Sequence, residues 1–201
     1  MEIIFLVFAA FITSSISAVI GMGGGIILLG VMAILIPEGY MVIALHGIIQ
    51  LVSNTTRAFI FKRNIKKQLI KDFFIGAILG LFCSAIIIFA SIYYFNVQSA
   101  NQIKVDFLKP FIGIFILWYL FLKKSKKTGK NSSFKNVGFI SGISSIFIGA
   151  TGPLIAPFYL NIQLTKKGII ANKAACQMIS HLGKIPLFIF LFNVSYSFEY
   201  Q

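Results

Sequence analysis

Charged residues are scarce in this sequence of 201 residues, where they make up 11% of the chain, whereas an average soluble domain contains about 25%. Such a chain has too few charges to cover a water-exposed surface, which argues against a soluble enzyme and against a disordered tail. Cysteine is scarce as well: Cys83 and Cys176 both lie in apolar runs, and two cysteines are too few for a disulfide scaffold.

Acidic residues are the rarest group, with only 5 Asp and Glu in the whole chain. None of them lies inside a long apolar run, which argues against a carboxylate proton relay and against a carboxylate-rich divalent-cation site. Two histidines make a poor transition-metal site on their own, and no nucleophile–base pair is recognisable. We therefore expect neither an enzyme nor a bound cofactor or metal.

Long hydrophobic runs are what the sequence does contain, since hydrophobic residues make up 58% and 22 residues are Phe. A helix needs about 20 apolar residues to cross a bilayer. The pattern predicts an all-α polytopic membrane protein, with the lipid bilayer as a partner. The expected membrane segments are Ile3–Pro37, Met41–Phe61, Phe73–Phe95, Phe107–Leu122, Asn136–Asn161 and Ile169–Phe192.

Basic residues outnumber acidic ones by 18 to 5, which gives a formal net charge of +13. A basic chain can bind nucleic acid, but here the charges cluster in short gaps between apolar runs, at 62–71 and 123–135. That placement is typical of cytoplasmic loops under the positive-inside rule and argues against a nucleic-acid partner. We expect a multi-pass protein of the cell (inner) membrane.

Glycine-rich stretches interrupt the first and fifth apolar runs, at 21–25 and 149–153. If each run crossed the membrane once, Lys166 and Lys167 would lie opposite the two basic clusters. If each run is a hairpin of two half-helices, all these basic residues are cytoplasmic and the N-terminus is outside. The hairpin interpretation fits the positive-inside rule better.

The two interrupted runs resemble each other, because Ser17 and Gly24 match Ser145 and Gly152 at a constant separation. The helices that follow match in their polar positions too. On the hairpin topology the copies are inverted, which is the organisation of many secondary transporters and predicts a site between them. We therefore expect two related, inverted repeats with glycine-broken helices. Their ranges are 1–122 for repeat 1, 123–135 for a basic cytoplasmic linker and 136–201 for a shortened repeat 2.

Two polar stripes with identical spacing lie in the segments after the glycine runs. Each stripe covers one helix face over about 16 Å and has a cation or histidine at both ends. A Lys or Arg near the middle of a membrane helix costs about 2.5–3.5 kcal/mol, so a duplicated stripe indicates an anion-binding site. Freed amide groups in the glycine runs would also attract anions. The predicted substrate-binding residues are His46, Gln50, Ser53, Asn54, Arg57, Lys173, Gln177, Ser180, His181, Lys184, Gly23, Gly24, Gly25 and Gly152.

Plainer interpretations of these residues remain open at this point. Arg57 and Lys184 lie near helix ends, where their side chains could reach the interface. Gln and Ser side chains could simply join helices by hydrogen bonds, and the glycines could serve close helix packing.

The glycine runs and the duplicated stripes together resemble the sulfite exporter TauE/SafE family, over nearly the whole chain. The resemblance rests on Gly21–Gly25, its second copy Gly149–Pro153, and the stripes around His46–Arg57 and His181–Lys184. It implies a multipass permease with two related halves that moves sulfite, sulfonates or related small anions. Family chains usually continue beyond the equivalent of Phe192, so this chain is shorter than the family pattern.

Two functions follow from these observations. The first is a permease that exports small anions, with sulfite or organosulfonates as substrates and alternating access as its mechanism. The second is a non-transporting membrane subunit or a truncated permease remnant. A homo-oligomer is a further expectation, because it would complete the shortened second half.

Overall fold

The computed structural model describes residues 2–20, 23–103, 108–118, 121, 133–160, 162 and 164–195. All regular structure in these residues is helical, which agrees with the predicted all-α class. The helices are α1 (Glu2–Ile20), α2 (Gly24–Leu35), α3 (Gly39–Ile60), η1 (Lys62–Asn64), α4 (Lys67–Tyr94), η2 (Ala100–Gln102), α5 (Leu108–Leu117), α6 (Phe134–Phe147), α7 (Gly152–Leu160) and α8 (Lys166–Phe192). The predicted linker lies outside the described residues as far as Ser132.

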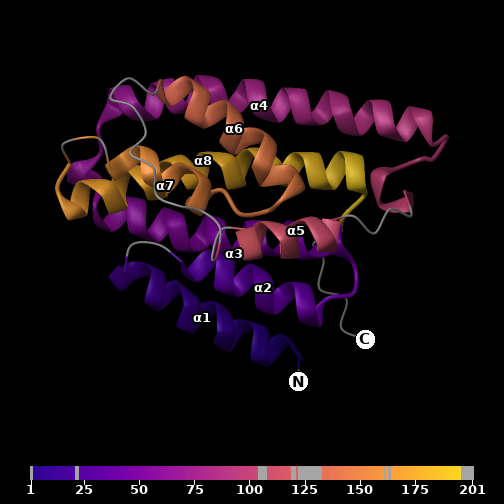
Figure 1. Ribbon diagram of the computed structural model, residues 1–201, viewed down its shortest axis with the longest axis horizontal. Coiled ribbons are helices and arrows are strands. Elements are labelled where there is room, and N and C mark those ends of the chain that lie inside the picture. Colours follow the sequence, from indigo (N-terminus) through magenta and orange to yellow (C-terminus); the bar gives the residue numbers. More distant parts are fainter. Residues whose placement is uncertain are drawn as a thin grey trace.

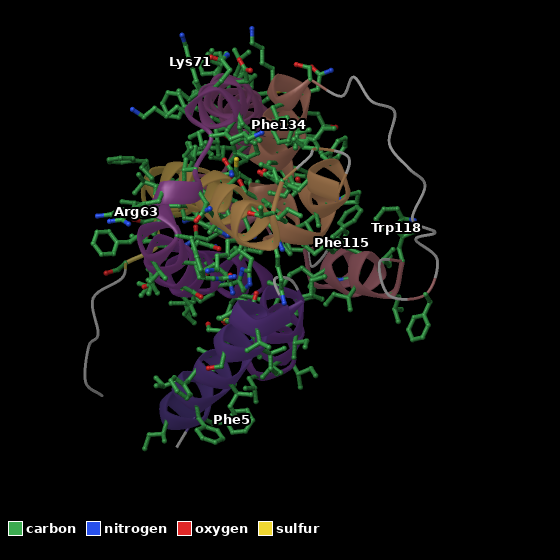
Figure 2. The ribbon with its side chains drawn as sticks, turned by 90° about the vertical axis from the view of Figure 1, so that its left-hand side faces the viewer. Phe5, Arg63, Lys71, Phe115, Trp118 and Phe134 are labelled. Atoms are coloured by element: carbon green, nitrogen blue, oxygen red, sulfur yellow. The ribbon has the colours of Figure 1, made fainter. Side chains whose placement is uncertain are left out.

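Helices α4 and α8 are both long and apolar enough to cross a membrane. Exposed aromatic side chains are common on α4, including Phe82 at 65% and Phe89 at 66% exposure. A soluble protein rarely leaves such a continuous apolar surface in water, whereas lipid accommodates it. Figure 2 shows Phe5 and Trp118 pointing away from the helices.

Both glycine runs break their helices, as the sequence predicts. Helix α1 ends at Ile20 and α2 begins at Gly24, with Gly23 at a φ of 101° between them. Helix α6 ends at Phe147 and α7 begins at Gly152, with Gly149 at a φ of 83°. Glycine adopts these positive φ values without steric cost. At each break the chain folds back, so that α1 and α2 form one antiparallel pair and α6 and α7 another (Figure 1).

Helices α3 and α8 run antiparallel and pack against each other at the centre of the molecule, with α4 on one side and the α1–α2 pair on the other (Figure 1). Except for Lys109, which lies beside Gly39 at the start of α5, the described basic residues of the loops and helix starts gather at one end, which we call the basic end. They are Lys62, Arg63, Lys66, Lys67, Lys71, Lys135, Lys166 and Lys167. Glu38, η2 and the start of α1 lie at the opposite end, called the Glu38 end.

Helices α4 and α6 approach each other at backbone distance. A Cβ atom added to Gly80 would collide with the carbonyl oxygen of Phe139, and one added to Gly142 would lie 2.6 Å from the carbonyl oxygen of Ala77. Gly76 and Gly138 are equally close to the facing backbone. Small residues allow this packing inside a membrane, where there is no hydrophobic force between helices.

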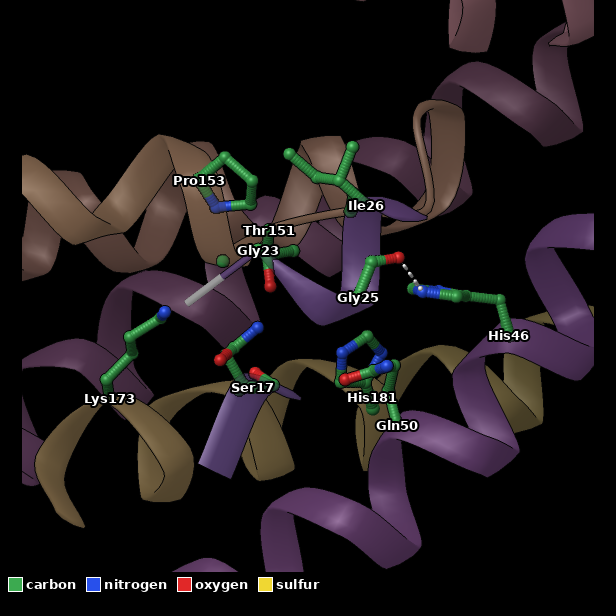
Figure 3. A pocket seen from close by; sticks show the side chains of 13 residues that line it. Ser17, Gly23, Gly25, Ile26, His46, Gln50, Thr151, Pro153, Lys173 and His181 are labelled. Atoms are coloured by element: carbon green, nitrogen blue, oxygen red, sulfur yellow. Dashed lines mark hydrogen bonds between the residues drawn. The ribbon is translucent and has the colours of Figure 1, made fainter. Parts of the chain in front are cut away.

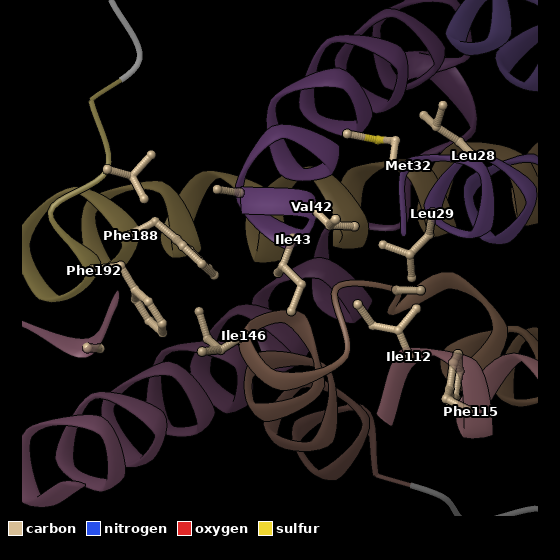
Figure 4. Close-up of a cluster of buried hydrophobic side chains, with 14 of the residues drawn as sticks. Leu28, Leu29, Met32, Val42, Ile43, Ile112, Phe115, Ile146, Phe188 and Phe192 are labelled. Carbon is tan, nitrogen blue, oxygen red and sulfur yellow. The ribbon is translucent and has the colours of Figure 1, made fainter. Parts of the chain in front are cut away.

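A cluster of buried apolar side chains fills the Glu38 end of the molecule. Ile43, Ile146 and Phe188 meet there from α3, α6 and α8 (Figure 4). The rings of Phe188 and Phe192 stack with centroids 4.6 Å apart, and Tyr40 stacks on Phe192 at 6.1 Å. A wider cavity of about 790 Å³ lies beside this cluster at the Glu38 end, with Glu38, Ile88 and Phe192 in its wall.

Candidate functional site

A small polar cavity lies where the two helix breaks meet α3 and α8 (Figure 3). Its volume is about 20 Å³, which is room for about one water molecule. A sulfur oxyanion is several times larger than water, so the site is closed in this conformation. The lining residues are Ser17, Gly23, Gly25, Ile26, His46, Gln50, Ala150, Thr151, Gly152, Pro153, Lys173, Gln177 and His181.

The two glutamines of the stripes each pack against a glycine of the break in their own half. A Cβ atom on Gly25 would lie 3.3 Å from Nε2 of Gln50, and one on Gly152 would lie 2.7 Å from Nε2 of Gln177. The absent side chains at these glycines therefore let both amides reach the backbone of the broken helices. The two halves of the site are built alike in this respect.

The two histidines face each other across the cavity. Nε2 of His46 lies 2.8 Å from the carbonyl oxygen of Gly25, and this geometry assigns it as the donor. The rings of His46 and His181 have centroids 6.0 Å apart at an angle of 73°. His181 is fully buried, and both of its ring nitrogens lack a hydrogen-bond partner among the described residues. Unpaired buried groups are costly unless water or a ligand satisfies them.

Arg57 joins α3 to α1 beside the cavity. Its Nη1 donates to the hydroxyl of Ser17 at 3.0 Å, and its Nη2 donates to the hydroxyl of Ser53 at 2.9 Å. Lys173 lies on α8 and is 4% exposed. Figure 3 shows its amine pointing into the cavity from the side opposite His46.

Lys184 is fully buried on the far side of the histidines. Its Nζ donates to the carbonyl oxygen of Ile43 at 2.9 Å, and its side chain packs against Gly47, where a Cβ atom would collide with it. Lys184 therefore does not extend to the membrane interface. Arg57 is also buried, at 8% exposure.

Neither Arg57 nor Lys184 has an Asp or Glu partner in the part of the chain that the structure describes. A buried charge without a counter-charge is unfavourable by several kcal/mol. The cavity therefore has an electrostatic preference for anions. No group of three His, Cys, Asp or Glu side chains able to hold a metal occurs among the described residues.

The structure brings eight of the predicted site residues to the cavity wall and places six outside it. On the wall are Gly23, Gly25, His46, Gln50, Gly152, Lys173, Gln177 and His181. Away from it are Gly24, Ser53, Asn54, Arg57, Ser180 and Lys184.

The six have distinct surroundings. Gly24 packs against the backbone of Thr13 in α1, and the Ser180 hydroxyl is 2.9 Å from the Ser141 hydroxyl on α6. Ser53 is bound to Arg57. The buried side-chain amide of Asn54 has no hydrogen-bond partner in the described region.

Five lining residues were not among the predicted site residues: Ser17, Ile26, Ala150, Thr151 and Pro153. Thr151 is fully buried and its hydroxyl has no partner among the described residues. Its position inside the glycine run could have identified it as a site residue, because a polar side chain at a helix break faces the same cavity as the backbone amides that the break leaves without helical partners. Ser17 shows a signal as well, since it matches Ser145 in the repeat.

Helices with lipid-facing surfaces, two helix breaks and a buried cationic cavity between them are the features of a membrane transport protein. Comparison with known families supports this class. A family model described as Sulfite exporter TauE/SafE matches residues 6–198, so the chain belongs to this family of membrane transporters. Comparisons with curated proteins and with solved structures found no match.

Proposed function

We propose that this protein is a permease that exports small anions, with sulfite or organosulfonate-type compounds as its substrates. The observation that carries the proposal is the composition of the central cavity. Lys173 lines it, Arg57 and Lys184 flank it, and glutamine and histidine side chains supply further donors. Anionic oxygens accept hydrogen bonds from all of these groups.

Alternating access by two inverted repeats is the proposed mechanism. The antiparallel course of α3 and α8, each preceded by a glycine-broken hairpin, supports it. The cavity holds only about 20 Å³, so substrate entry requires the two halves to separate on one side. We propose that one repeat rocks against the other around the Gln50–Gln177 level.

The proposed orientation places the basic end in the cytoplasm and the start of α1 outside, in the cell (inner) membrane. The gathering of exposed Lys and Arg side chains at that end supports this orientation. An inside-negative potential then drives anions outward by about 2.3 kcal/mol per charge per 100 mV. Export therefore needs no separate energy source for a species that carries net negative charge.

The test is anion flux in proteoliposomes that contain the purified chain, with sulfite, thiosulfate and sulfate compared under an imposed potential. We expect saturable, potential-sensitive flux of at least one anion. Arg57→Ala should lower that flux about tenfold or more, because a hydrogen bond to a charged group contributes about 1.5–3 kcal/mol. Arg63→Ala is the matched control, since Arg63 is exposed at the basic end and should leave flux unchanged.

Wild-type flux in Arg57→Ala would contradict the role of this residue. If correctly inserted wild-type protein moved none of the anions, the permease proposal would be wrong. The non-transporting subunit or remnant would then be the better interpretation.

A further inference from the structure

Lys184 has fewer hydrogen-bond acceptors than a charged lysine requires. An ammonium group has three N–H donors, whereas the described structure gives Nζ of Lys184 one acceptor, the carbonyl oxygen of Ile43 at 2.9 Å. The side chain is fully buried and packs against the bare backbone of Gly47. A neutral amine, with two N–H groups and a lone pair, fits this environment better because it leaves less charge unsolvated.

The titratable groups that face Lys184 offer no negative charge to balance a cation there. They are His46 from α3 and His181 from α8 itself. The described part of α4 and α6 adds no buried acid or base at this level: on these helices Lys67, Lys71 and Lys135 are exposed and Asp72 is partly exposed. The charge that would favour protonation of Lys184 is therefore missing until an anion enters the cavity.

We infer that Lys184 is a proton-binding site that is coupled to the anion site. It is neutral while the cavity is empty and takes up one proton when an anion binds, so that anion and proton cross together. This inference rests on the proposed permease function. It adds that the substrate moves with a proton rather than alone.

The step balances as a simple proton transfer. The lone pair of Nζ forms a new N–H bond with a proton that leaves hydronium or water on the side from which the anion enters. When the anion leaves on the other side, that N–H bond breaks and the proton passes to water there. The positive charge near the cavity thus appears and disappears together with the negative charge of the substrate.

His181 provides the route between the cavity and Lys184. It lines the cavity, lies one helical turn from Lys184 on α8, and has both ring nitrogens unpaired among the described groups. An imidazole with two available nitrogens can accept a proton on one and release it from the other. His181 is a positioning residue in this scheme, since it acts on the anion site through Lys184.

Arg57 at the matching position of the other stripe behaves differently. Its guanidinium is permanently charged and its donors are held by Ser17 and Ser53. The two ends of the site are thus unequal, with a fixed cation on one stripe and a titrating one on the other. For a divalent anion this means that one net negative charge crosses with each proton, so that both the membrane potential and the pH gradient act on the flux.

Proton uptake on anion binding tests the inference directly, without transport. The purified full chain is placed in weak buffer with a pH indicator and titrated with sulfate or thiosulfate. These anions do not change their own protonation near neutral pH, whereas sulfite does. We expect an uptake of about one proton for each anion bound by the wild-type protein.

Lys184→Met and Lys184→Arg should both lose the proton uptake, because methionine has no proton site and arginine stays charged. Lys71→Met, at an exposed site on α4, should keep it. The arginine variant retains a cation and serves if the methionine variant does not fold. In addition, His181→Phe should slow the uptake, because it removes the imidazole that lies between the cavity and Lys184.

The outcomes separate this inference from the permease proposal. Anion binding by wild-type protein without proton uptake would overturn the proton site and leave the permease intact. Proton uptake that persists in both Lys184 variants would also overturn it, because another group would then carry the proton. If neither anion bound at all, both proposals would be wrong.

Discussion

Thr151 is a polar residue in a fully buried position. It is fully buried at the second helix break, and its hydroxyl lines the cavity without a partner among the described residues. A hydroxyl kept in this position has no structural benefit, because an unpaired buried polar group costs about 1–3 kcal/mol. We interpret it as a donor that is reserved for the anion or for the water that the anion displaces.

Thr151→Val removes this hydroxyl and keeps the shape of the side chain. We expect the affinity for the transported anion to fall about tenfold or more, in line with about 1.5–3 kcal/mol for a hydrogen bond to a charged group. Thermal stability should stay the same or increase, since an unpaired polar atom is lost. Calorimetric titration and thermal unfolding measure the two effects, with Thr56→Val on the exposed face of α3 as the control. Weaker stability with unchanged affinity would show that the hydroxyl has a structural role.

The stripes on α3 and α8 show which site residues could be predicted from the sequence and which could not. Helical spacing put His46 and Gln50 on one face of their helix, and the structure brings both to the cavity wall together with Gln177 and His181. It did not show where the breaks of the hairpins meet the stripes along their length. Ser53 and Ser180 therefore turned out to bind Arg57 and Ser141 instead of lining the cavity.

Close contact between α4 and α6 is the main feature at the scale of elements. It depends on four glycines, and a Cβ atom on Gly80 would collide with the backbone oxygen of Phe139. Gly80→Ala should therefore destabilise the protein by about 1–3 kcal/mol, as overpacking does in well-packed cores. Gly113→Ala on α5 is the matched control, because nothing lies within 4 Å of a Cβ atom added there.

Thermal unfolding of the two variants in the same detergent compares them. Gly113→Ala should be as stable as the wild type or slightly more so, since alanine favours a helix by about 1 kcal/mol over glycine. Equal stability of Gly80→Ala and Gly113→Ala would contradict the packing described for α4 and α6.

Helix breaks were predictable from the sequence, whereas helix partners were not. Glycine has no Cβ atom and adopts positive φ values easily, so a glycine run is a local reason for a helix to end. The ends of α1 and α6 could therefore be predicted from the glycine runs. The pairing of α4 with α6 joins segments from the two halves of the chain, and it depends on glycines that are spread singly along apolar helices. The expected span Phe107–Leu122 contains helix α5 only at Leu108–Leu117 among the described residues.

At the scale of the whole molecule, the distribution of charge is the strongest constraint. The basic end collects exposed Lys and Arg residues from η1 and from the starts of α4, α6 and α8. That arrangement requires the second glycine-broken segment, α6 and α7, to fold back on itself. A single crossing of each would put Lys167 on the side opposite Asn64. The hairpins and the orientation are therefore linked, and one experiment can test both.

Single cysteines at Asn64, Gln102 and Lys167 report the side on which each position lies. All three side chains are exposed. Of the native cysteines, Cys176 is fully buried, and Cys83, which is partly exposed on α4, is replaced by serine in each variant. We expect a membrane-impermeant thiol reagent to label Gln102→Cys in intact cells, and to label Asn64→Cys and Lys167→Cys only after the membrane is opened.

Labelling of Lys167→Cys in intact cells would mean that a glycine-broken segment crosses the bilayer, which would invalidate the inverted repeat. Labelling of Asn64→Cys and Lys167→Cys but not of Gln102→Cys would reverse the orientation, so that the basic end would face the outside of the cell. Labelling of Asn64→Cys and Gln102→Cys from the same side would show that α4, which is long and apolar enough to cross a membrane, does not span it.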